Sequence, residues 1–291
     1  MPKRSDFATD AAVMNELLPV SPTILDLRHG DCVAGMAELP ENSVDVAVTS
    51  PPYNLDIAYG EYRDDAPRED YLAWCIRWAA EVRRVLKEEG SFFLNVGASP
   101  ANPLLPHQIV LALQPLFKLQ NTLHWIKSIT VQPKRSPELS VGHFKPINSR
   151  RFLTDCHEYI FHLTKSGNVP LDRLAVGTGY SDKSNIARWG HTGGRDLRCR
   201  GNNWFIPYQT IQSRKSDRPH PATFPAQLAE WCIRLHGAQR DLVALDPFLG
   251  LAHSAEGARN CSIARFIGFE IDAAYLQEAR ERLGLSPAPG S

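Results

Sequence analysis

Short apolar runs of strand length alternate with helical patterns at both ends of the chain, and this alternation constrains the fold more than any other feature. The longest helical pattern spans Arg68–Lys87, where apolar side chains recur every three or four residues. The other expected helices are Cys32–Leu39, His107–Phe117, Pro225–His236, Ser254–Asn260 and Ala273–Leu283. The expected strands are Ile24–Leu27, Val44–Val48, Ser91–Val96, Leu119–Trp125, Glu158–Thr164, Leu242–Leu245 and Phe266–Glu270. Such βαβ alternation predicts an α/β fold.

The middle of the chain, from about Ser128 to Arg218, breaks this pattern. Pro, Gly, Ser, Asn and Arg cluster there, and only Glu158–Thr164 keeps a clear strand pattern. A chain of 291 residues, 43% of them hydrophobic, can bury one large core. The simplest organisation is therefore one α/β domain that carries a sizeable insertion.

Basic and acidic side chains balance over the whole chain, at 32 each, but they are unevenly distributed. From Lys127 to Arg218 there are 16 Lys and Arg against 7 Asp and Glu, a net charge of +9, and the rest of the chain carries −9. This asymmetry suits a phosphate-facing surface on an otherwise neutral protein. A solvated basic face that binds nothing explains the charge equally well.

Several classes of protein are disfavoured. No apolar stretch is long enough to cross a membrane, and the polar start Met1-Pro2-Lys3-Arg4-Ser5 lacks the core of a signal peptide, so we expect a soluble, cytoplasmic protein with no membrane partner. The six cysteines are scattered without CxxC pairs. This spacing argues against a structural zinc site and against a disulfide framework, and predicts reduced, mostly buried thiols and no bound metal.

The turn Asp246-Pro247-Phe248-Leu249-Gly250 follows a predicted strand and precedes a predicted helix. A second predicted strand then ends in an acid, Glu270, 24 positions after Asp246. This is the layout of a nucleoside-binding unit, in which the later carboxylate accepts hydrogen bonds from ribose hydroxyls. Many α/β proteins that bind no nucleotide share it. No lysine follows the glycine, which disfavours a nucleotide triphosphate.

The turn Ser50-Pro51-Pro52-Tyr53 also follows a strand-like run, and its parts have chemical uses. An exocyclic base amine is a poor nucleophile until acceptors hold its hydrogens, and a serine hydroxyl and a backbone carbonyl can serve as those acceptors. The two prolines stiffen the corner, and Tyr53 offers a face on which an extruded base can stack. A plain proline turn that ends a strand, or a Pro-Pro-x-Tyr peptide ligand, remains open at this point.

Taken in order, these segments resemble the amino-group DNA methyltransferases of the beta arrangement, in which the catalytic block comes first, the target-recognition region next and the cofactor block last. The matching segments are His29-Gly30-Asp31-Cys32 through Leu39, Ser43-Val44-Asp45 up to Tyr53, Glu81 to Leu86 with Gly90 to Gly97, His157 to Ile160 with Lys165, His220 to Pro225, Asp246 to Gly250, and Gly268 to Asp272 with Tyr275, Ala279, Arg282 and Leu283. They cover nearly the whole chain except about 98–146 and 166–214.

The resemblance implies a class I S-adenosylmethionine-dependent methyltransferase fold, circularly permuted, with a mostly parallel, doubly wound sheet and an inserted target-recognition region. It implies a catalytic role for Ser50, Pro51, Pro52 and Tyr53. It also implies that S-adenosylmethionine is bound by Asp31, Cys32, His220, Ala222, Phe224, Asp246, Phe248, Gly250, Ala252 and Glu270. Ala252 stands where the family usually has a second glycine, and its Cβ is expected to crowd the cofactor or tighten the turn.

The implied reaction is methyl transfer to an exocyclic amine of a flipped base in double-stranded DNA, as in restriction-modification, without a covalent enzyme intermediate. None of the cysteines neighbours a proline, which disfavours the cysteine nucleophile that C5 methylation of cytosine uses. Serine at the first position of the tetrad favours cytosine N4, with adenine N6 as the alternative. An RNA or protein amine as acceptor, or an inactive DNA-binding relative, also stays open.

The resemblance divides the chain into a catalytic half at 1–127, a target-recognition region at 128–218 with a core strand near 157–165, a cofactor half at 219–285 and a disordered tail at 286–291. Expected DNA contacts in the basic middle segment are Lys134, Arg135, Lys145, Arg150, Arg151, Arg188, Arg195, Arg198 and Arg200, followed by Arg214, Lys215 and Arg218. Relatives of this arrangement often dimerise, which leaves a homodimer open.

Overall fold

The computed structural model describes residues 22–54, 65–131, 139–141, 149–153, 155–188, 194–207 and 223–286. The nine strands in these ranges form one sheet in the order β1-β9-β8-β2-β3-β6-β4-β5, with β7 paired to β4. They are β1 (Ile24–His29), β2 (Val44–Thr49), β3 (Leu86–Val96), β4 (Lys118–Val131), β5 (Leu139–Val141), β6 (His157–Thr164), β7 (Asn203–Pro207), β8 (Val243–Asp246) and β9 (Arg265–Glu270).

The strand order shows the permutation directly. The carboxy-terminal strands β8 and β9 lie between the amino-terminal strands β1 and β2, and β1, β9, β8, β2 and β3 all run parallel. Beyond β3, strand β6 runs antiparallel to both β3 and β4. The predicted circular permutation and mostly parallel sheet are therefore confirmed.

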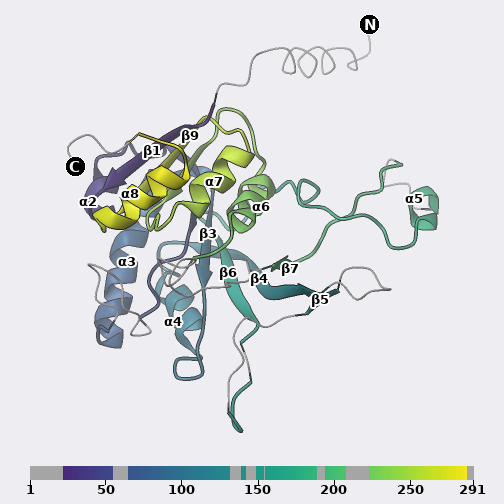
Figure 1. Cartoon of the computed structure of the whole chain (residues 1–291), viewed down its shortest axis with the longest axis horizontal. Helices are drawn as coiled ribbons and strands as arrows, with labels where there is room; N and C mark the ends of the chain where they lie inside the picture. The colour runs from purple at the N-terminus through teal and green to yellow at the C-terminus, as the bar shows by residue number, and fades with distance from the viewer. Residues whose placement is uncertain are drawn as a thin grey trace, which may run out of the picture.

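Helices cover both faces of the sheet, which makes it doubly wound as predicted. One face packs α2 (Cys32–Ala37), α3 (Arg68–Val85) and α4 (Leu105–Ala112) over a core that includes Trp78 and Phe92. The other face packs α6 (Ala226–His236), α7 (His253–Asn260) and α8 (Ala273–Arg282). Figure 1 shows α6, α7 and α8 grouped apart from α3 and α4, with β5, β7 and the short helix α5 (Ser184–Arg188) on the side away from α8.

Several predicted boundaries were wrong by two residues or more. Helix α3 ends at Val85, and β3 begins at Leu86, so the acidic stretch before Gly90 is strand. The reason is strand pairing: Leu86 already pairs with Val44 of β2, and a bulge follows before Ser91 pairs with Val46. Helix α4 ends at Ala112, five residues before the predicted end, and β4 runs on to Val131.

Strand β7 was missed because Gly201, Asn202 and Pro207 suggest a loop around it. Its side chains nevertheless alternate, with Trp204 and Ile206 buried and the residues beside them exposed, because β7 pairs with β4 at the sheet edge. The short elements α5 and β5 were also missed.

The cysteines of the chain are free thiols. Cys32, Cys75 and Cys232 are buried, Cys156 and Cys261 are partly buried, and Cys199 is exposed. Across the described ranges, no helix has the length and apolar character that a bilayer crossing needs. The predicted tail lies outside the described residues from 287 onward.

Candidate active site

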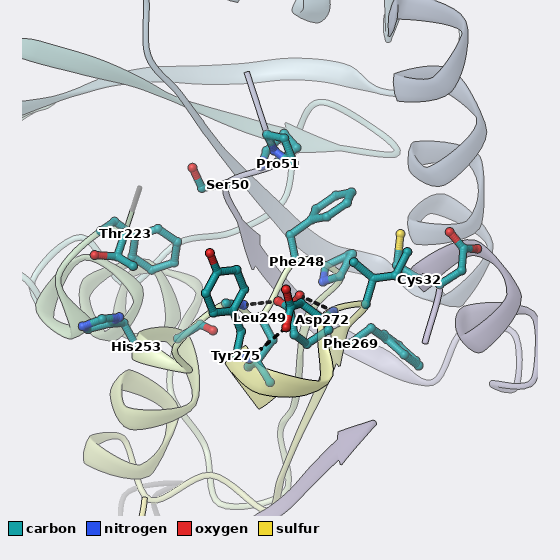
Figure 2. Close-up of a pocket in the computed structure, with 18 of the residues that line it drawn as sticks. Cys32, Ser50, Pro51, Thr223, Phe248, Leu249, His253, Phe269, Asp272 and Tyr275 are labelled. Carbon is teal, nitrogen blue, oxygen red and sulfur yellow. Dashed lines mark hydrogen bonds between the residues drawn. The ribbon is translucent and has the colours of Figure 1, made fainter. Parts of the chain in front are cut away.

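A pocket lies where the carboxyl ends of β2, β8 and β9 meet, the edge at which open α/β sheets bind ligands. The two motifs from opposite ends of the chain share it. Its wall is formed by Gly30, Asp31, Cys32, Ser50, Pro51, Pro52, Tyr53, Trp74, Thr223, Phe224, Pro247, Phe248, Leu249, Gly250, His253, Ser254, Phe269, Glu270, Ile271, Asp272 and Tyr275. Figure 2 shows Ser50 and Pro51 on one side, Asp272 and Tyr275 on the other, and Phe248 between them.

Asp246, at the end of β8, connects the two motifs through hydrogen bonds. Its Oδ1 accepts hydrogen bonds from Thr49 Oγ1 at 2.5 Å and from Phe248 N at 3.0 Å, and its Oδ2 accepts from Ser254 Oγ at 2.5 Å. The carboxyl is fully buried, and burial raises its pKa to about 6. We predicted Asp246 as a direct ligand of the cofactor's methionine portion. Its side chain is buried next to Pro247 and Phe248 of the pocket wall and fixes the turn after β8 against the end of β2, and its contact with the cofactor stays a prediction.

Glu270 ends β9 and faces the pocket. Its Oε2 accepts a hydrogen bond from Gly250 N at 2.8 Å and its Oε1 accepts one from Asp272 N at 2.9 Å. Burial raises the pKa of this carboxyl. Each carboxylate oxygen has a further lone pair, so Glu270 can still accept from hydroxyl groups of a ligand in the pocket.

Asp31 and Cys32 lie at the start of α2, beside Gly30 at the end of β1. Asp31 caps the helix, its Oδ1 accepting from Ala34 N at 3.0 Å, and both Asp31 and Cys32 line the pocket. Burial raises the pKa of the Cys32 thiol to about 12, so the thiol is a neutral, weakly polar part of the wall.

Phe248 forms an aromatic wall with two tryptophans of α3. Its ring centroid lies 5.4 Å from that of Trp74 and 5.2 Å from that of Trp78. Trp74 lines the pocket and was missed from the sequence. Trp74 and Trp78 are four residues apart, which predicts that both lie on the buried face of a helix. The neighbouring sequence gives no sign that Trp74 contacts a ligand.

The Ser50-Pro51-Pro52-Tyr53 corner is held by hydrogen bonds on both sides. Tyr71 of α3 donates its hydroxyl proton to the Pro52 carbonyl at 2.7 Å, and the Ser50 and Tyr53 hydroxyl oxygens are 2.6 Å apart. Tyr53 is 8% exposed, and its hydroxyl also contacts Glu158 of β6 and Asn95 of β3. The Ser50–Tyr53 corner is therefore tied to two strands that the motif does not include.

Ala252 takes a left-handed conformation, with φ at 63°, and caps α7. It is completely buried between Gly250 and His253, which both line the pocket, while Ala252 itself is not part of the wall. Its predicted contact with the cofactor stays a prediction. Alanine in place of the family's usual glycine costs backbone energy at this position, because a Cβ is unfavourable at positive φ.

Other members of the wall were not assigned from the sequence. Asp272 caps α8, accepting from Ala274 N and Tyr275 N, and it lines the pocket with Tyr275, Thr223 and His253. The predicted residues His220 and Ala222 lie outside the described residues, whereas Phe224 is part of the wall. In the described part of the chain, no three His, Cys, Asp or Glu side chains are grouped so that they could hold a metal ion.

Among the predicted DNA contacts that the structure describes, Arg150, Arg151, Arg188, Arg195 and Arg198 are exposed. Arg200 differs. Its Nε donates to the Val176 carbonyl at 2.8 Å, its Nη2 donates to the Gly177 carbonyl at 3.1 Å, and its guanidinium lies 4.3 Å from the centre of the Trp231 ring. Arg200 therefore anchors a loop. Lys134, Arg135, Lys145, Arg214, Lys215 and Arg218 lie outside the described residues.

Comparisons with known proteins agree with this geometry. The family described as DNA methylase, which comprises N6 and N4 methyltransferases, matches residues 44–281. The type II methyltransferase M.ScaI of Streptomyces caespitosus is 29% identical over 281 residues, which cover 88% of this chain and 80% of that protein.

Two solved structures share the fold. The PvuII DNA methyltransferase, described as cytosine-N4-specific, aligns with a TM-score of 0.65 at 19% identity over 90% of this chain and 87% of that one. TTHA0409 of Thermus thermophilus, a putative DNA modification methylase solved with S-adenosyl-L-methionine, aligns with a TM-score of 0.58 at 25% identity over 92% and 96%. The predicted class I S-adenosylmethionine-dependent methyltransferase fold is confirmed.

Proposed function

Because this chain belongs to the DNA methylase family of N6 and N4 methyltransferases, we propose that it methylates the N4 amine of cytosine at a specific sequence in double-stranded DNA. The protein is a DNA methyltransferase that uses S-adenosylmethionine. The proposal concerns which atom of the DNA it methylates and which residues act on that atom.

The observation that carries the proposal is the Ser50 hydroxyl on the wall of the pocket, at a corner stiffened by Pro51 and Pro52 and fixed by Tyr71. A hydroxyl oxygen and the Pro51 carbonyl are acceptors suited to the two hydrogens of an exocyclic amine. The first position of the tetrad is serine, which the amino-group family tends to carry in its cytosine-N4 enzymes.

The opposite side of the pocket fits S-adenosylmethionine. Glu270 is available to the ribose hydroxyls, Asp31 stands near the adenine end, and Phe248 with Trp74 gives an apolar wall. Gly250 has φ at 51°, and such a turn without a Cβ lets a ligand approach the backbone closely. When bound, the cofactor supplies an activated sulfonium methyl group.

The chain's own residues then act mainly by positioning. Ser50 and the Pro51 carbonyl hold the amine hydrogens and turn the nitrogen towards tetrahedral geometry, while the ring of Tyr53 contacts the flipped base. Because the methyl group is already activated, positioning contributes more than proton abstraction, and no strong general base is required.

Adenine N6 is the second candidate, because the matched family comprises both kinds of enzyme. The same acceptors at Ser50 and Pro51 suit the adenine amine. The two candidates differ only in the modified nucleoside, which mass measurement of digested DNA distinguishes.

We assign DNA recognition to the basic region 128–218, the catalytic half to 1–127 and the cofactor half to 219–285. Exposed Arg150, Arg151, Arg188, Arg195 and Arg198 are the described candidates for phosphate contact. A homodimer remains compatible with this assignment.

The proposed function is tested by incubating the protein with methyl-labelled S-adenosylmethionine and separate pools of duplex DNA, RNA and protein. We expect label in duplex DNA alone. Label in RNA or protein would reverse the assignment of the acceptor. Salt-dependent DNA binding with no label in any pool would instead identify an inactive relative.

A further inference from the structure

We propose that Glu158 sets the direction of a hydrogen-bond chain that ends at Ser50, so that Ser50 offers the target amine a lone pair and not a proton. The inference rests on the proposed function, because it concerns how Ser50 accepts from the amine. Glu158 is thus a positioning residue: it acts through Tyr53 and is not one of the pocket residues.

Glu158 lies near the start of β6 and is 8% exposed. Its Oε1 forms an ion pair with Lys127 Nζ. Its Oε2 accepts hydrogen bonds from Asn95 Nδ2 at 2.5 Å and from the Tyr53 hydroxyl at 3.0 Å. A carboxylate that is paired with an ammonium group has no proton to give, so every partner of Glu158 must donate to it.

The Tyr53 hydroxyl has one proton and two lone pairs, and its neighbours decide where each points. Glu158 Oε2 and the Asn95 carbonyl, 3.3 Å away, can only accept, so the proton of Tyr53 points towards them. Asn95 Nδ2 donates to one lone pair of the Tyr53 oxygen at 2.9 Å. The second lone pair is left for Ser50, whose oxygen is 2.6 Å away.

Ser50 therefore donates its proton to Tyr53. Asn95 Nδ2 lies 3.4 Å from Ser50 Oγ and faces one of its lone pairs. The other lone pair remains for the pocket side, where Ser50 is part of the wall (Figure 2). An amine that must lose electron delocalisation before it reacts needs acceptors, so this orientation suits the reaction. If the Ser50 proton faced the pocket, it would meet the hydrogens of the amine.

Gly97, just after the end of β3, leaves room for the side chains of this hydrogen-bond chain. A Cβ at Gly97 would lie 3.0 Å from Tyr53 Cε2 and 3.3 Å from Glu158 Cδ, so glycine lets these side chains approach the end of β3. A buried ion pair is usually no more stable than apolar residues of the same volume. The position of the Lys127–Glu158 pair beside the Ser50–Tyr53 corner therefore suits a role in orientation better than a role in stability.

Glu158→Gln tests the inference with little change in shape. The amide oxygen would face Lys127, and the amide NH₂ would face Tyr53 and reverse the chain, so that the Ser50 proton points into the pocket. We expect the single-turnover rate of methyl transfer to fall about a hundredfold, as when a preorganised hydrogen bond to a reacting group is lost. The Kd for S-adenosylmethionine, measured by calorimetry, should stay close to wild type. The Tm should fall, because Lys127 loses its charged partner, so the rate is measured well below the Tm of the variant.

Tyr53→Phe is the second variant, because it keeps the ring and removes only the hydroxyl that links Glu158 to Ser50. We expect about a tenfold loss of rate, since one hydrogen bond no longer fixes Ser50. Glu158→Gln should then cause little further loss of rate in the Tyr53→Phe background, because Glu158 and Ser50 are no longer connected by hydrogen bonds through the Tyr53 hydroxyl. Glu88→Gln is the matched control, since Glu88 pairs with Lys165 on the surface, and it should keep the wild-type rate.

The outcomes separate this inference from the proposed function. A wild-type rate in Glu158→Gln, or equal losses from that change with and without the Tyr53 hydroxyl, would overturn the role of Glu158 and leave the methyltransferase assignment intact. A wild-type protein that methylates no DNA would overturn the proposed function, and the inference with it.

Discussion

The two sides of the pocket are built in different ways. On the cofactor side, Glu270 is held by the backbone N–H groups of Gly250 and Asp272, both within a short stretch of chain. On the catalytic side, Ser50 and Tyr53 depend on side chains of Asn95 and Glu158, which come from other strands. Local backbone geometry thus fixes the side proposed for the cofactor, whereas long-range side-chain contacts fix the side proposed for the amine.

The largest expected effect is on the catalytic side. Ser50→Ala should lower the single-turnover rate of methyl transfer at least about a hundredfold, because one of the two acceptors for the amine is lost. The Kd for S-adenosylmethionine should stay near wild type. Calorimetry and a quenched-flow transfer assay check the two quantities separately. Weakened cofactor binding with an unchanged rate would break the division between the two sides.

Glu270→Ala should show the reverse pattern. Loss of hydrogen bonds from a carboxylate to the ribose should raise the Kd for S-adenosylmethionine by about ten- to a hundredfold. At saturating cofactor, the transfer rate should change less than the Kd. Glu281→Ala on the exposed surface of α8 is the control, and an unchanged Kd in Glu270→Ala would contradict the ribose role.

Two arginines of the basic region are expected to have different roles. Arg200 should stabilise the fold, and Arg198 should contact DNA phosphate. Arg200→Ala should destabilise the fold by about 1–2 kcal/mol, because the carbonyls of Val176 and Gly177 lose their donors and the Trp231 ring loses its cation. Thermal unfolding measures this loss.

Exposed Arg198→Ala is the counterpart. It should leave the Tm nearly unchanged and reduce the salt dependence of DNA binding by about one released ion. The Arg198 side chain donates weakly to the neighbouring Cys199 carbonyl, at 3.5 Å, so little structure depends on it. The opposite pattern, with salt dependence reduced by Arg200→Ala, would show that Arg200 contacts phosphate.

The smallest expected effect is at Ala252. Ala252→Gly should stabilise the protein by about 1 kcal/mol, because glycine takes positive φ without the Cβ penalty. Cofactor affinity should change little, since Ala252 is buried and is not itself part of the pocket wall. A tighter Kd in this variant would show that the Cβ does crowd the cofactor.

That the turn after β8 and Glu270 meet at one pocket could be predicted from the sequence, because the two segments are close in the chain. The turn at Asp246 to Gly250 and the acid Glu270 lie in one strand-turn-helix-strand unit, and both contribute to the pocket wall. The pattern does not show the burial of Asp246, nor the hydrogen bonds that its carboxylate accepts from Thr49 and Ser254.

The support of the catalytic side could not be predicted. Tyr53 and Glu158 are 105 positions apart, and their contact depends on the antiparallel register of β3 and β6. Strand β7 pairs with β4 across a similar separation, and its five residues are too few to show a pattern. Trp74 is one of several apolar residues on α3, and only the fold turns it towards Phe248.

The most direct test of the central claim is the mass of the modified nucleoside. Duplex DNA is incubated with the protein and S-adenosylmethionine that carries a deuterated methyl group, then digested to nucleosides and measured against standards. We predict the deuterated methyl group on N4 of deoxycytidine. A deuterated methyl group on carbon 5 of cytosine, or DNA that remains unmodified, would contradict transfer to an amine held at Ser50.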